Sequence, residues 1–217
     1  MRTYRELFRT PEFTPLFTTS ALQVAGTTVN GLALSTLVYA ATGSPLLAAL
    51  AMFGPSLAQV LGATVLLSAA DRLPPRAAMT GLGVLFAVGA VVLSVPGLPV
   101  WALFTVVLGL GPFASLAGGV RYGLLNEILP REAYLLGRSV LNMSVGIMQI
   151  CGFATGGVLV TLLSPRGTLL VAAGLYLLAA AAARFGLTRR PPRATGRPSV
   201  AATWRNNGVL WSSVPRR

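Results

Sequence analysis

Neutral polar side chains recur at helical spacing inside the apolar stretches of this sequence. In one stretch they are spaced by three, four and three residues, at Ser20, Gln23, Thr27 and Asn30. Residues three or four apart lie on one face of an α-helix. Similar residues recur in two other stretches, as Ser56 with Gln59 and Asn142 with Gln149. Because amides and hydroxyls donate and accept hydrogen bonds without charge, the pattern predicts neutral hydrogen-bonding chemistry.

The sequence offers few residues for acid–base, nucleophilic or metal chemistry. The chain has no histidine, and none of its five acidic residues lies inside an apolar run. The single cysteine, Cys151, excludes a disulfide within the chain, and we expect it to be a small buried packing residue. One cysteine without histidine cannot build a zinc site. We therefore expect no enzymatic activity, no cofactor and no metal.

The composition argues against a soluble protein. Of the 217 residues, 54% are hydrophobic and 10% charged, and the mean hydropathy is +0.72. A soluble domain carries about 25% charged residues, and disorder requires low hydrophobicity. The net charge of +12 comes from 17 arginines and five acidic residues, and the sequence contains no lysine. It would favour nucleic acid as a partner only if the arginines gathered on one accessible face.

The charge-free intervals predict an all-α membrane protein with six transmembrane helices. These intervals span residues 13–70, 77–120, 139–165 and 167–183, and turn-like clusters at 42–45 and 96–99 divide the first two. A transmembrane helix needs about 20 apolar residues. The predicted helices are 16–41, 46–69, 77–95, 100–121, 138–163 and 167–187, with a kink expected at Pro112.

This arrangement places sixteen arginines on one side of the membrane and Arg166 alone on the other. Such a bias marks the cytoplasmic side, so we expect both termini in the cytoplasm and no nucleic-acid partner. Residues 1–187 form the expected transmembrane domain, and residues 188–217 form a basic, proline-rich cytoplasmic tail. The arginines of the tail either rest on anionic lipid or stay solvated and only enforce the topology.

The polar stripe has two interpretations. As a set, Gln23, Thr27, Asn30, Gln59, Asn142 and Gln149 favour a solute pathway through the first, second and fifth helices. Alternatively they form interhelical hydrogen bonds, which typically contribute about 0.6 kcal/mol per pair. The third and sixth helices contain few polar residues, so we expect them to face lipid. The GxxxG step of Gly152 and Gly156 predicts close helix packing.

Several segments resemble the major facilitator superfamily in the right order along the chain. Asp71-Arg72, followed by Arg76, resembles the loop motif after the second helix, although Leu67 stands where that motif has glycine. The segment 8–13, the turn at 42–45, Arg121 with residues 126–132, and residues 152–157 resemble other parts of drug and siderophore exporters. In the last of these segments, Phe153 replaces a usual proline.

The resemblance implies the N-terminal six-helix half of such a transporter, built from inverted three-helix repeats. The first and fourth helices would line the cavity, and the third and sixth would lie outside. It also implies small-molecule efflux by alternating access, with a cytoplasmic gate formed by Asp71, Arg72, Arg76 and Arg121. Thr27 stands where many proton-coupled exporters carry an acid.

The expected partners are a small-molecule solute, the lipid bilayer and a second six-helix half. Members of the family have about twelve helices, and residues 203–207 resemble the linker before the seventh, so we expect a truncated N-terminal half. The alternatives are a half-transporter that dimerises and a non-transporting membrane subunit or gene remnant. The abundant alanine and arginine suggest a GC-rich bacterial genome and hence a bacterial plasma membrane.

Overall fold

The structure, a computed structural model, describes residues 4–70 and 72–192, and for residues 64–69 it describes only the helical backbone. Throughout this described part the regular structure is helical, and five of its helices are long and apolar enough to cross a membrane. The helices are α1 (Tyr4–Phe8), α2 (Phe13–Thr42), α3 (Pro45–Ala70), α4 (Pro75–Ser94), α5 (Val100–Ile128) and α6 (Arg131–Gly186). In lipid, a helix satisfies its backbone hydrogen bonds internally, which explains why apolar segments take this form.

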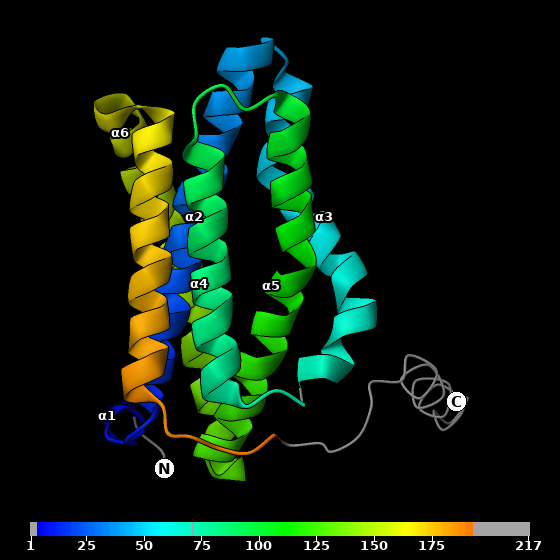
Figure 1. Cartoon of the computed structure of the whole chain (residues 1–217). Coiled ribbons are helices and arrows are strands. Elements are labelled where there is room, and N and C mark those ends of the chain that lie inside the picture. The colour runs from blue at the N-terminus through cyan, green and yellow to red at the C-terminus, as the bar shows by residue number, and fades with distance from the viewer. Residues whose placement is uncertain (1–3, 71, 193–217) are drawn as a thin grey trace, which may run out of the picture.

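The longest helix, α6, is interrupted at Ser164, whose φ of 69° and ψ of 164° are not helical. The next residue, Pro165, has no backbone N–H to continue the helical hydrogen bonding. In Figure 1 the chain rises along the first stretch of α6 and returns along the second. The break falls between the two helices predicted here, 138–163 and 167–187.

Glycines in the left-handed region form the two predicted turns. Gly43, with φ of 64°, ends α2, and its N–H donates to the carbonyl oxygen of Tyr39 at 2.8 Å. Gly97, with φ of 81°, lies in the connection from α4 to α5. Residues with a β-carbon rarely adopt these angles, so glycine is required at both turns. The predicted breaks at 42–45 and 96–99 are therefore confirmed.

The boundary between the fourth and fifth predicted helices was wrong. We expected one helix to end at residue 121 and the next to begin at 138, but α5 continues to Ile128 and α6 begins at Arg131. The apolar run marks only the lipid-facing core of a helix, whereas backbone hydrogen bonding continues through the polar residues beyond it. Arg121 consequently lies two turns inside α5 and not in a connection.

Small residues bring the helices close together. A β-carbon at Gly152 of α6 would lie 2.9 Å from Cβ of Thr28 in α2, and one at Gly156 would lie 3.2 Å from Cδ2 of Leu32. The close packing predicted from the GxxxG step is confirmed. Between α3 and α5, a β-carbon at Gly111 would lie 2.8 Å from the carbonyl oxygen of Pro55.

The two ends of the bundle differ in charge. One end holds α1, the start of α2, the start of α4 and the end of α6 (Figure 1). There Arg190 forms ion pairs with Glu12 at 3.0 Å and with Glu127 at 3.4 Å, and Thr188 donates a hydrogen bond to Glu12. These contacts tie the segment after α6 to α2 and α5. Arg166 follows the Ser164 break at the opposite end.

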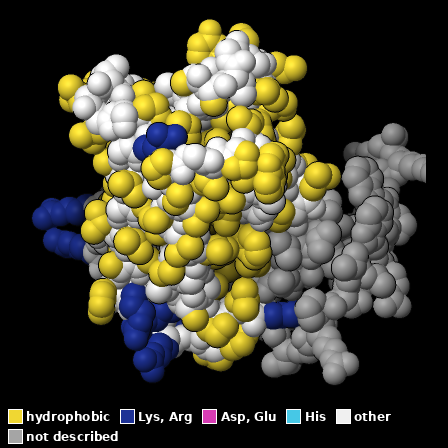
Figure 2. Space-filling view, turned by 45° about the horizontal axis from the view of Figure 1, so that its top comes forward, with side chains coloured by type: hydrophobic (Ala, Val, Ile, Leu, Met, Phe, Trp, Pro, Cys, Tyr) yellow, Lys and Arg dark blue, Asp and Glu magenta, His cyan; other side chains and the backbone are white. Residues whose placement is uncertain are grey.

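Apolar side chains cover much of the surface, as Figure 2 shows for one face. Large exposed examples lie along α3, including Phe53, Leu57 and Leu61, and along the first stretch of α6. Cys151 is exposed as well, contrary to our expectation of a buried packing residue. The reason is that α6 packs on α2 through Gly152 and Gly156, which leaves the adjacent side chain at position 151 outside the contact.

The glycine contact between α2 and α6 predicts a position-specific effect on stability. Gly152→Ala should destabilise the protein by about 1–3 kcal/mol, because the new methyl group meets Thr28 at 2.9 Å. The matched control is Gly157→Ala on the same helix, since a β-carbon there has nothing within 4 Å. Thermal unfolding of both variants in detergent measures the difference. Equal melting temperatures for the two variants would contradict the packing described here.

Candidate functional site

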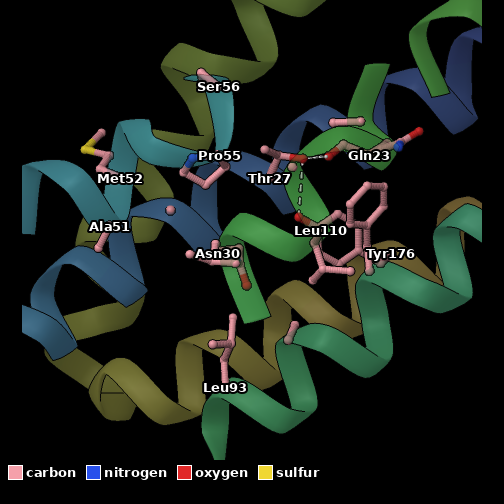
Figure 3. Close-up of a pocket in the computed structure, with 16 residues that line it drawn as sticks. Gln23, Thr27, Asn30, Ala51, Met52, Pro55, Ser56, Leu93, Leu110 and Tyr176 are labelled. Carbon is pink, nitrogen blue, oxygen red and sulfur yellow. Dashed lines mark hydrogen bonds between the residues drawn. The ribbon is translucent and has the colours of Figure 1, made fainter. Parts of the chain in front are cut away.

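A pocket of about 110 Å³ lies between α2, α3, α4, α5 and α6. Its residues come from the middle of α2, α3 and α5, where a membrane-spanning helix passes the centre of the bilayer. Figure 3 shows polar and apolar side chains converging on this space. The polar ones are Gln23, Thr27, Asn30, Ser56 and Tyr176.

One wall of the pocket is a short chain of hydrogen bonds between α6 and α2. The Tyr176 hydroxyl donates to Oγ1 of Thr27 at 3.3 Å, and Thr27 donates to the backbone carbonyl oxygen of Gln23 at 2.9 Å (Figure 3). The tyrosine ring fits here because α2 has glycine opposite it. A β-carbon at Gly26 would lie only 3.0 Å from Cε1 of Tyr176. The ring of Phe86 on α4 lies 5.6 Å from the tyrosine ring.

The side chain of Asn30 contributes a polar atom to the pocket that has no hydrogen-bond partner. Its side-chain oxygen Oδ1 is buried and has no hydrogen-bond partner. A buried carbonyl oxygen without a donor is costly, and such groups are satisfied in most proteins by protein, water or ligand. Asn30 therefore offers an acceptor to a molecule that enters the pocket.

The pocket is neutral. None of the described residues that line it carries a charge, and apolar side chains such as Met52, Leu93 and Leu110 complete its walls. Recognition in such a space rests on shape, apolar contact and a few oriented hydrogen bonds. Part of the predicted polar stripe thus lines a neutral cavity, and its use as a solute pathway remains a prediction.

The structure brings together half of the predicted pathway residues. Gln23, Thr27 and Asn30 line the pocket, whereas Gln59, Asn142 and Gln149 do not. On α3 the polar position at the pocket is Ser56. On α6, Asn142 instead accepts a hydrogen bond from the Tyr122 hydroxyl at 2.7 Å. Spacing along one helix predicts a shared face, but it does not predict which neighbour that face meets.

Sequence reasoning missed two aromatic residues of the pocket. Phe86 lies on α4 and Tyr176 on the second stretch of α6, the two helices expected to face lipid. In the structure both helices also contribute buried residues, among them Ala87, Ala90 and Ala173. The available signal was Tyr176 itself, in the middle of the predicted helix 167–187, because a tyrosine hydroxyl requires a partner when buried.

Arg121 anchors a second polar cluster, nearer the arginine-rich end. Its Nη1 donates to Oγ of Ser20 on α2 at 2.7 Å, and its guanidinium lies 4.8 Å from the ring centre of Tyr122. Arg138 of α6 approaches the same ring at 5.6 Å. With the Tyr122–Asn142 bond, the cluster joins α2, α5 and α6.

Two of the other predicted gate residues lie at or beside the connection from α3 to α4. Asp71 is outside the described residues. Arg72 lies in the turn between α3 and α4, and Arg76 lies at the start of α4, where it lines a different pocket. The joint role predicted for these four residues therefore remains a prediction.

A comparison with family models identifies the class of protein. The model of the Major Facilitator Superfamily matches residues 16–216, which is nearly the whole chain. The chain belongs to this superfamily, and it is a multi-pass membrane protein of the transporter class, whose members carry small-molecule solutes. No curated protein matches the chain.

The Arg121 cluster predicts that Ser20 matters more than another buried serine. Ser20→Ala should destabilise the protein by about 1–3 kcal/mol, because Nη1 of Arg121 loses its acceptor while its buried Nε already lacks one. Ser144→Ala is the control, since Ser144 is buried and donates only to the carbonyl of Leu141 in its own helix. Thermal unfolding reports both effects.

A double-mutant cycle separates this bond from local packing. If the hydrogen bond to Ser20 stabilises the protein, Ser20→Ala should lower the free energy of unfolding less in the Arg121→Gln background than in the unaltered protein. Strictly additive effects would contradict a direct contribution of the Ser20–Arg121 bond.

Proposed function

We propose that this transporter exports a small neutral or amphipathic solute, and that the pocket between α2 and α6 is its part of the solute pathway. The observation that supports this most is the buried, unpartnered Oδ1 of Asn30 in a pocket that also presents Gln23, Thr27 and Tyr176. An amphipathic solute would place a donor against Asn30 and its apolar surface against the aliphatic wall.

The proposed architecture is a six-helix unit, with the two stretches of α6 counted as separate spans. The break at Ser164 supports this count, because the chain reverses direction there, at the end of the bundle opposite the arginine-rich end. We propose two inverted repeats of three helices, α2–α4 followed by α5 and the two stretches of α6. The arginine bias supports a cytoplasmic location for the α1 end, in a bacterial plasma membrane.

Alternating access would require a second six-helix unit. The apolar side chains exposed along α3 and the first stretch of α6 support such a contact, since these elements also carry Gln59, Asn142 and Gln149. Polar groups at that position favour a protein neighbour over lipid, because lipid tails offer them no hydrogen bonds. The second unit is either a copy of this chain or a separate half.

The proposed gate lies at the arginine-rich end. The Arg121 cluster joins α2 and α5 through the Arg121–Ser20 bond, and α5 and α6 through the Tyr122–Asn142 bond, so movement of any of the three helices would disturb it. Asp71, Arg72 and Arg76 would complete the gate against the second unit. The alternative, a membrane subunit without transport activity, keeps the same contacts but binds no solute.

The role of Asn30 is tested by solute binding. Purified chain is titrated with a panel of neutral amphipathic fluorescent dyes, and Asn30→Leu should weaken binding about tenfold because it removes the free acceptor. Thr105→Val is the control, since Thr105 is exposed on α5 and donates only to Trp101 in its own helix. Equal weakening by both substitutions, or no dye bound by the unaltered chain, would count against the proposed pocket.

The need for a second unit is tested in vesicles. Liposomes that hold single copies of the chain should show no saturable solute uptake, because one six-helix unit cannot enclose the pathway from both sides. Two differently tagged copies expressed in one membrane should co-purify if the second unit is another copy. Saturable uptake by single copies would overturn the requirement for pairing.

A further inference from the structure

A second, larger pocket of about 590 Å³ lies at the arginine-rich end, between the start of α4 and the end of α6. Its charged lining consists of Arg76, Arg184, Arg189 and Arg190. Its size is within the range of small-molecule sites in proteins. It is separate from the central pocket, and Arg76 is its one residue that also belongs to the proposed gate.

Within the part of the chain that the structure describes, little of the positive charge of this pocket is compensated. Among the described residues that line it there is no acidic side chain. Arg190 is paired with Glu12 and Glu127, but in the described chain no carboxylate pairs with Arg76, Arg184 or Arg189. Three guanidinium groups that share a pocket with no carboxylate partner among the described residues favour an anionic ligand.

A hydroxyl in the same pocket also lacks a partner. Several threonines elsewhere in the bundle donate to the carbonyl four residues earlier, as Thr27 and Thr155 do. Oγ1 of Thr80, in contrast, is buried and unpartnered, and Thr80 lines the pocket one turn after Arg76. Its hydroxyl could therefore donate to an anion held by the arginines.

We propose that this pocket binds a phosphate monoanion or diester, with Arg76, Arg184 and Arg189 as the charged ligands and Thr80 as a further donor. Guanidinium groups match the oxygens of phosphate in charge and geometry. The two available sources are the headgroup of an anionic phospholipid and free phosphate.

The surroundings of the pocket favour the lipid headgroup. Gly81 lines the pocket and is followed along α4 by the exposed residues Val84, Val88 and Val91. These positions lie on one face at helical spacing. An acyl chain could follow this face while the headgroup occupies the pocket, and basic pockets between transmembrane helices bind such headgroups.

The two sources are distinguished with purified full-length chain in detergent. Its melting temperature is measured with added phosphatidylglycerol or with phosphatidylcholine, and separately in sodium phosphate or in sodium chloride of equal ionic strength. A headgroup site predicts a saturable rise with phosphatidylglycerol alone. A rise in sodium phosphate over sodium chloride assigns the pocket to free phosphate, and no rise with any additive overturns the proposal.

Charge variants locate the effect. Arg76→Gln, Arg184→Gln and Arg189→Gln should each raise the half-saturating concentration of phosphatidylglycerol about fivefold, as expected from about 1 kcal/mol per arginine. Arg131→Gln, an exposed arginine at the same end of the bundle but outside the pocket, should leave it unchanged. An equal rise in the half-saturating concentration for Arg131→Gln would show that phosphatidylglycerol is attracted to the basic surface in general, and it would overturn the proposal.

A charge-neutral variant tests occupancy of the pocket itself. A β-carbon at Gly81 has nothing within 4 Å, so Gly81→Leu starts a side chain in open space beside the pocket. This variant should fold with an unchanged or higher basal melting temperature and lose the rise caused by phosphatidylglycerol. A full rise in Gly81→Leu would overturn binding inside the pocket.

Discussion

Every charged or hydrogen-bonding group in this bundle must find a partner inside the protein or lie near an end, because hydrocarbon offers none. The backbone meets this constraint by forming helices. Many threonine and serine side chains meet it by bonding to their own helix, as Thr28 does with Val24. Arg121, two turns inside α5, meets it in part, through Ser20 and the Tyr122 ring, while its Nε stays unpartnered. The few buried groups that remain unpartnered, such as Oδ1 of Asn30, therefore stand out as candidate ligand contacts.

Close approach of the helices follows from the same constraint. Lipid tails are as apolar as leucine, so helices associate through packing and not through exclusion of water. Small residues allow this between α2 and α6 at Gly152, and between α3 and α5 at Gly111. Gly111 and Pro55 also line the central pocket, so the contact that joins α3 to α5 forms part of its wall. Packing and the proposed solute pathway thus share residues.

The chain separates its polar chemistry into two regions. The central pocket is neutral and lies among the middles of the helices, whereas the second pocket is basic and lies where α4 begins and α6 ends. A neutral or amphipathic solute and an anionic headgroup would therefore not compete for one site. Arg190 lines the basic pocket, but its charge is already paired with Glu12 and Glu127. Its main contribution is to hold the end of the bundle together.

The sequence alone determined the membrane class, the apolar part of each helix, both glycine turns and the neutral character of the polar stripe. These features follow from local composition and from helical periodicity, whereas the polar end of α5 and the start of α6 do not. The sequence also predicted that Ser20, Gln23, Thr27 and Asn30 share a face, and the last three of these line the central pocket. Only the tertiary structure decided which helices meet. Tyr176 reaches Thr27 across 149 positions of sequence, and Arg121 reaches Ser20 across 101. No local pattern encodes such pairs, since they depend on the lengths of α5 and α6 and on where glycines let the helices touch.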